Sequence, residues 1–140
     1  MPIGTRDHAR IVGVTGAALI GSSIVGGIAS VLAGTNTWAN AWTAEATLAA
    51  PWPMLVAQTS ASIAAVQRRR GLALAGSIVL GLTAAVAGIS GFFDGQLARS
   101  DLGTGHVAGQ IAYVVVAWAT VAVAVLRTAA LRRNRSLLNR

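Results

Sequence analysis

The sequence predicts an all-α integral membrane protein, built as an antiparallel bundle of four transmembrane helices with both termini cytoplasmic. Hydrophobic residues make up 54% of the 140-residue chain, whereas charged residues make up only 11%. A soluble domain carries about a quarter charged residues, so this chain lacks the polar surface needed to face water on all sides. Long uncharged runs alternate with short arginine clusters, as expected for membrane spans and their connections. The length fits one domain over residues 1–140.

Four segments are expected to cross the membrane, followed by a basic cytoplasmic tail. The spans cover about residues 11–33, 46–66, 71–93 and 107–126, and the tail covers 127–140. The first run carries no charge and can cross a hydrocarbon layer of about 30 Å at 1.5 Å per residue. It is longer than the roughly 7–15 apolar residues of a cleavable signal peptide, so we expect it to be retained. Short connections between the spans favour antiparallel neighbours.

The second span has two possible starts, because prolines flank Trp52. A start at Pro51 leaves 16 residues before Gln67, fewer than the roughly 17–25 that cross a bilayer. We therefore prefer a start near Ala46 with a bend at the prolines, since neighbouring helices can satisfy the carbonyl that a proline leaves free. The alternative is a short interfacial helix over 38–49 followed by a short tilted span.

The arginines set the expected orientation. An even number of spans brings ten of the eleven to one side, and only Arg99 falls on the other. By the positive-inside rule, the side with the ten arginines is cytoplasmic. The net charge of +7 could also indicate nucleic acid, but the clusters adjoin apolar runs and no basic helix face is interleaved with aromatic residues. We expect no nucleic-acid partner.

The composition excludes several kinds of chemistry. The chain has no cysteine and no lysine, which rules out disulfides, thiolate metal sites and Schiff-base catalysis. His8 and His106 are expected on opposite sides of the membrane, so they cannot jointly ligate a haem iron. We expect no cofactor and no metal.

Glu45, Asp94 and His106 are the candidate catalytic residues, because all three are expected at the outer ends of the helices. On an unbroken helix Glu45 would share a face with three tryptophans, Trp38, Trp42 and Trp52. An apolar indole wall disfavours the charged form of a carboxyl group. Asp94 follows two phenylalanines, and imidazoles such as His106 suit proton transfer near neutral pH. Glu45 and His106 also have an ordinary interpretation as helix-end residues in contact with headgroup water.

The candidate substrate-binding residues are aromatic and amide side chains. They are Trp38, Trp42, Trp52, Gln58, Phe92, Gln110 and Tyr113. Tryptophans are equally typical of membrane interfaces. The two glutamines and Tyr113 also suit interhelical hydrogen bonds worth about 1 kcal/mol, and we favour that role for Gln58 and Gln110. Arg99 and Asp101 are interpreted as a surface ion pair.

Small residues recur every four positions in the first and third spans, which is the spacing that close helix contacts in membranes require. These residues are Ser22, Gly26, Ser30 and Gly34 in the first span, and Ala73, Ser77, Gly81 and Ala85 in the third. We predict close contacts at both faces, within one chain or across a homodimer.

Three functions fit these features. The first is a small membrane enzyme that performs acid/base chemistry on a lipophilic substrate, giving isomerisation, cyclisation or epoxide opening, with aromatic rings stabilising a developing cation. The second is an accessory or scaffold subunit of a larger membrane complex. The third is a small homodimeric transporter, which requires a polar path to the inner face. Membrane lipid and a lipophilic small molecule are the expected partners in the first case.

Overall fold

The computed structural model describes residues 5–44, 46, 48–93 and 103–138 and contains four helices. They are α1 (Thr5–Leu32), α2 (Trp52–Ala65), α3 (Arg70–Phe93) and α4 (Thr104–Leu138). No strand occurs among the described residues, so the predicted all-α class is confirmed. Three helices contain stretches long and apolar enough to cross a membrane, namely Asp7–Leu32, Arg70–Phe92 and Thr104–Arg133. This composition indicates membrane association.

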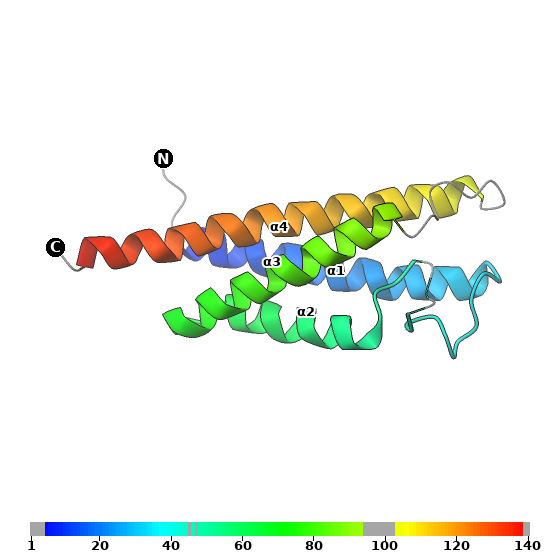
Figure 1. The fold of residues 1–140 in the computed structure, drawn as a ribbon, viewed down its shortest axis with the longest axis horizontal. Helices are drawn as coiled ribbons and strands as arrows, with labels where there is room; N and C mark the ends of the chain where they lie inside the picture. Colours follow the sequence, from blue (N-terminus) through cyan, green and yellow to red (C-terminus); the bar gives the residue numbers. More distant parts are fainter. Residues whose placement is uncertain (1–4, 45, 47, 94–102, 139–140) are drawn as a thin grey trace.

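α1, α2 and α4 run roughly along one long axis, and α3 crosses them obliquely (Figure 1). α1 packs against α2 and α4, and α3 packs against the same two helices, whereas α1 and α3 touch only marginally. The start of α1, the end of α4 and the 66–69 connection lie together at one end, which we call the arginine end (Figure 1). The 33–51 segment and the start of α4 lie at the opposite end, which we call the loop end.

α2 begins at Trp52, later than the expected start near Ala46, and has only 14 residues. Pro51 explains the difference, because its backbone is extended (φ −59, ψ 150) and a proline disfavours helical conformation in the residue before it. Pro53 is tolerated because it falls in the first turn, where backbone N–H groups have no intrahelical partner. The described residues of 38–49 form successive turns rather than the alternative interfacial helix.

α4 continues to Leu138, so part of the predicted basic tail is helical. Arg127, expected in that tail, is only 4% exposed. Its Nε and Nη2 donate to the Ala65 carbonyl at 3.4 and 3.3 Å. That carbonyl belongs to the last turn of α2, where carbonyls lack intrahelical partners. Arg70 at the start of α3 donates in turn to the Leu131 carbonyl of α4, so two arginines join three helices at the arginine end.

α2 and α3 approach each other closely at Gly76. A Cβ atom there would lie 2.7 Å from the Ala61 carbonyl oxygen and would also collide with the backbone nitrogen of Ala65. Both atoms belong to the α2 backbone, which cannot rotate away as a side chain would. Glycine is therefore required at this crossing.

The predicted small-residue faces coincide only partly with the buried sides of the helices. In α1 the buried line passes through Ser23, Gly27 and Ser30, while Ser22 and Gly26 beside it are half-buried. In α3 the first two predicted residues are buried, and the last two are half-buried. At these faces a Cβ atom would meet Leu48 if added to Gly26, and Ala124 of α4 if added to Gly81.

A cavity at the loop end as the candidate functional site

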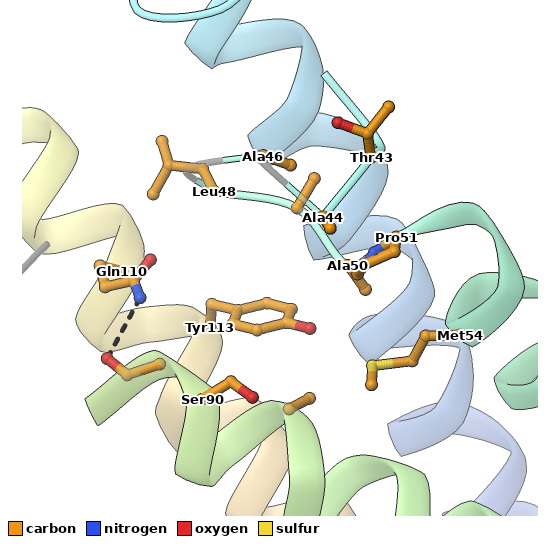
Figure 2. Close-up of a pocket in the computed structure, with 13 residues that line it drawn as sticks. Thr43, Ala44, Ala46, Leu48, Ala50, Pro51, Met54, Ser90, Gln110 and Tyr113 are labelled. Carbon is orange, nitrogen blue, oxygen red and sulfur yellow. Dashed lines mark hydrogen bonds between the residues drawn. The ribbon is translucent and has the colours of Figure 1, made fainter. Parts of the chain in front are cut away.

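A cavity of about 240 Å³ lies at the loop end, between the 43–51 segment and the facing ends of α3 and α4 (Figure 2). Most of its wall is apolar, which suits a lipophilic ligand. Its volume is below the roughly 300–1,000 Å³ of sites for drug-sized ligands, so it fits a small molecule or one end of a longer one. The lining residues are Thr43, Ala44, Ala46, Leu48, Ala49, Ala50, Pro51, Met54, Ala87, Ser90, Gly91, Gln110 and Tyr113.

The segment that covers the cavity, residues 43–51, is directed by the end of α1. Gly34 has a φ of +72, a left-handed conformation that glycine adopts without steric cost. The Ser30 carbonyl accepts the backbone N–H groups of Thr35 and Asn36 at 3.0 and 3.2 Å. The Asn36 amide also donates to the Ser30 hydroxyl at 3.1 Å. Ser30 therefore closes the helix and turns the chain back over its own surface.

The returning segment packs against α1 at two adjacent glycines. A Cβ atom on Gly26 would collide with the backbone carbonyl of Leu48, and one on Gly27 would collide with the indole of Trp42. Three residues away, the Ser23 hydroxyl accepts the N–H of Ala50 at 2.6 Å. Close backbone approach and one buried hydrogen bond thus fix the cover of the cavity to α1.

Tyr113 forms the aromatic part of the cavity wall. It is 8% exposed, and its ring belongs to a core cluster with Leu19 and Ala117. Its hydroxyl forms a hydrogen bond with Ser23, the same side chain that accepts the N–H of Ala50. Figure 2 shows the ring lying across the cavity with its hydroxyl pointing away from Gln110. A hydrogen-bonded chain therefore links α4, α1 and the cover.

Gln110 lies at the other side of the cavity and joins two helices. It is 3% exposed, and its Nε2 donates to the Gly91 carbonyl of α3 at 3.2 Å, drawn dashed in Figure 2. A Cβ atom on Gly91 would lie 2.6 Å from Val114 Cγ2, so α3 and α4 approach closely here. The interhelical role favoured for Gln110 is therefore present in the structure.

Of the three predicted catalytic residues, the structure describes only His106. Glu45 and Asp94 lie outside the described residues. Ala44 and Ala46, on either side of Glu45 in the chain, both line the cavity. His106 is half-buried in the first turn of α4 and is not part of the lining. The structure thus places Ala44 and Ala46 at the same cavity as Gln110 and Tyr113 of α4.

The three predicted tryptophans do come together, but beside a different surface. Ring centroids lie 6.3 Å apart for Trp38 and Trp42, and 5.7 Å apart for Trp42 and Trp52. Trp42 and Trp52 line a groove between α1 and α2 rather than the cavity. Phe92 is 56% exposed and also lies outside the lining. Tyr113 is therefore the aromatic ring that a cavity ligand would meet.

Gln58 lies deeper in the core and is fully buried. Neither polar atom of its side chain has a hydrogen-bond partner in the described part of the chain, and the same holds for the hydroxyl of Ser62, one turn further along α2. Burying an amide without a hydrogen bond costs roughly 1–3 kcal/mol in proteins. Gln58 is therefore an energetically unfavourable position, in contrast to Gln110.

Sequence reasoning missed Ser23, Met54 and Ser90 as parts of the site. Ser23 lies in an uncharged run one position from the predicted small-residue face, and its partners come from two other segments. Met54 and Ser90 carry no chemical signature of their own. Their role depends on the fold of the 43–51 segment, which the preferred interpretation placed partly in a helix.

No protein-family model, curated protein or solved structure matches the chain. Physical features therefore define the class of protein: an all-helical chain with three membrane-length helices and a mainly apolar cavity at one end.

Proposed function

We propose that the protein is a multi-pass cell-membrane protein in which all four helices cross the bilayer. The three membrane-length helices support this topology, and so does the outer side of α2, where Val56 and Ile63 are 62% and 58% exposed. The 14 residues of α2 extend only about 21 Å at 1.5 Å per residue. The 43–51 segment completes this crossing, since non-helical backbone is tolerated at membrane depth where it is buried in protein.

Both termini face the cytoplasm in this proposal. The arginine end contains the start of α1 and the end of α4 (Figure 1). Arginines lie at all three chain segments that meet there, in agreement with the positive-inside rule. The loop end and its cavity then belong to the outer half of the membrane, open to molecules that enter from the bilayer.

We further propose that the loop-end cavity is the active site of an enzyme acting on a small lipophilic molecule. The supporting observation is that this mainly apolar cavity is lined by both chain neighbours of Glu45, one of only four acidic residues in the chain. Carboxyl groups in apolar surroundings are favoured in their protonated form. A proton donor at the edge of an apolar cavity is the arrangement that acid/base chemistry on an alkene or epoxide requires.

The proposed reaction needs no oxidant or reductant. Glu45 donates a proton to an alkene carbon or an epoxide oxygen, and Asp94 or His106 accepts a proton from the neighbouring carbon or from an attacking water. Isomerisation and ring opening by water then leave the number of protons on the protein unchanged. The Tyr113 ring faces the developing cation, and its hydrogen bond to Ser23 holds it in the wall.

The test is turnover of a panel of lipophilic alkenes and epoxides by purified protein in liposomes. We expect Glu45→Gln, Asp94→Asn and His106→Ala each to lower the rate by about 100-fold or more, the usual contribution of general acid/base groups. Asp7→Asn and His8→Ala at the arginine end are matched controls and should retain the wild-type rate. Equal rates in all five variants, or no turnover by the wild type, would contradict the proposal and favour an accessory subunit.

A further inference from the structure

A second hollow lies between α3 and α4, towards the arginine end. This groove has a volume of about 440 Å³ and shares no lining residue with the loop-end cavity. Its rim includes Leu82 and Val125, which are 63% and 59% exposed, so it opens sideways from the helix pair. The lining residues are Ser77, Ile78, Gly81, Leu82, Ala85, Val121, Val125, Thr128, Ala129 and Arg132.

The length of the groove matches half of a bilayer. On α3 the lining runs from Ser77 to Ala85, and on α4 from Val121 to Arg132. At 1.5 Å per residue these stretches extend about 12 and 16 Å along the helix axes. One leaflet of a hydrocarbon core about 30 Å thick is about 15 Å deep. The groove is therefore deep enough for one acyl chain of a single leaflet.

The end of the groove nearest the arginine end carries basic side chains. Arg132 is its charged lining residue and lies at the arginine end. Arg70 brings a second guanidinium close by, since its Nη2 donates to the carbonyl of Leu131 and lies 3.4 Å from that of Arg132. Guanidinium groups bind phosphate oxygens well because of their planar fork of N–H donors. Basic pockets between transmembrane helices on the cytoplasmic side are typical of anionic-lipid sites.

We propose that this groove binds one anionic phospholipid of the cytoplasmic leaflet. One acyl chain lies along the groove over the small side chains of Ser77, Gly81 and Ala85, and the phosphate lies against Arg132. The site rests on the membrane topology proposed above. It does not depend on the chemistry at the loop end, and it is detected by lipid binding rather than by turnover.

A second copy of the chain fits the same groove less well. Two copies in one membrane share the same orientation, and a twofold interface brings the same residues of both copies together. A dimer through this groove would therefore place two Arg132 side chains at the same depth, together with both copies of Arg70. A phosphate compensates this charge, whereas a second copy adds to it.

The test is native mass spectrometry of the purified protein in detergent, titrated with phosphatidylglycerol or phosphatidylcholine of identical acyl chains. We expect a one-to-one complex with phosphatidylglycerol, bound about tenfold more tightly than phosphatidylcholine. Arg132→Gln should weaken phosphatidylglycerol binding about fivefold, the effect of one basic contact to an anionic lipid, and should leave phosphatidylcholine binding unchanged. Arg133→Gln, at a neighbour outside the groove lining, is the matched control and should bind like the wild type.

A second pair of variants tests the acyl-chain part of the site. Ala85→Leu fills the groove and should weaken binding of both lipids, whereas Ala122→Leu, on an exposed part of α4 outside the groove, should not. Circular dichroism confirms that both variants are helical. Equal affinity for the two lipids would overturn the proposal. Dimers that Ala85→Leu converts to monomers would overturn it in favour of a second copy.

Discussion

The two ends of the molecule are held together by opposite means. At the arginine end, long charged side chains reach backbone carbonyls of other helices, as Arg127 does with Ala65 and Arg70 with Leu131. At the loop end, the absence of side chains at Gly26 and Gly27 lets non-helical backbone and an indole lie directly on α1. At the arginine end, long side chains bridge the distance between helices. At the loop end, the packed segments are in direct contact. Removing a side chain should therefore damage the first end, and adding a methyl group should damage the second.

The largest effect is expected for Gly26→Ala. The new methyl group would collide with the backbone carbonyl of Leu48, which cannot move without displacing the cover of the cavity. We expect a loss of about 3 kcal/mol in the free energy of unfolding, at the upper end of the usual cost of overpacking. Gly21→Ala in the same helix is the control, because a Cβ atom there meets nothing within 4 Å. Equal unfolding curves for both variants in mixed micelles would contradict the packing of this segment on α1.

A somewhat smaller effect is expected for Arg127→Met at the arginine end. Methionine keeps much of the side-chain length but leaves the Ala65 carbonyl without the guanidinium donor. A hydrogen bond to a charged group contributes about 1.5–3 kcal/mol, so we expect a loss of about 2 kcal/mol, measured by the same unfolding titration. Arg133→Gln, on the exposed side of the same helix, should change the stability by less than about 0.5 kcal/mol. A loss as large for Arg133→Gln would show that the capping of α2 is not the cause.

Gln58 and Gln110 are both buried glutamines, but only Gln110 has a side-chain hydrogen bond among the described residues. Gln58→Leu removes two buried atoms without hydrogen-bond partners and should stabilise the protein by about 1 kcal/mol. Gln110→Leu breaks the bond to Gly91 and should destabilise it by about 1 kcal/mol. Thermal unfolding of both variants measures the difference. Destabilisation by Gln58→Leu would show instead that this amide has a hydrogen-bonded partner in the membrane.

The smallest effect is expected for Tyr113→Phe. This change removes one hydroxyl and its hydrogen bond to Ser23 while the ring stays in the cavity wall. Hydrogen bonds between membrane helices contribute about 0.6 kcal/mol on average, so the stability should fall by about that amount. If Tyr113→Phe lowered the unfolding temperature but Ser23→Ala did not, this would contradict a hydrogen bond between the two side chains.

The positions of the long apolar helices were predictable from the sequence. The backbone conformation of the loop end was not. Uncharged runs and arginine clusters determine where α1, α3 and α4 lie, because hydrophobicity is summed over many residues. Pro51 was interpreted as a bend within a helix, but its extended backbone makes it the residue that precedes α2. The length requirement for a span favoured the longer helix, whereas the structure packs Trp42, Leu48 and Ala50 against α1 without a helix.

The residues of the candidate site were likewise only partly predictable from the sequence. Gln110 and Tyr113 were identified from their amide and aromatic side chains, and both line the cavity. The contact between Gly27 and Trp42 joins segments whose approach depends on the turn at Gly34, so spacing could not reveal it. The tryptophans still gather without the helix that their spacing predicts, since the Trp52 N–H donates to the Trp42 carbonyl at 2.9 Å.

Isotope transfer shows whether a proton from Glu45 reaches a lipophilic molecule in the loop-end cavity. The measurement is mass spectrometry of a lipophilic alkene incubated in D₂O with liposomes that contain the wild type or Glu45→Gln. We expect the wild type to transfer one deuterium to each product molecule and Glu45→Gln to transfer it about 100-fold more slowly. Equal deuterium incorporation by the two proteins, or product without deuterium, would contradict the proposal.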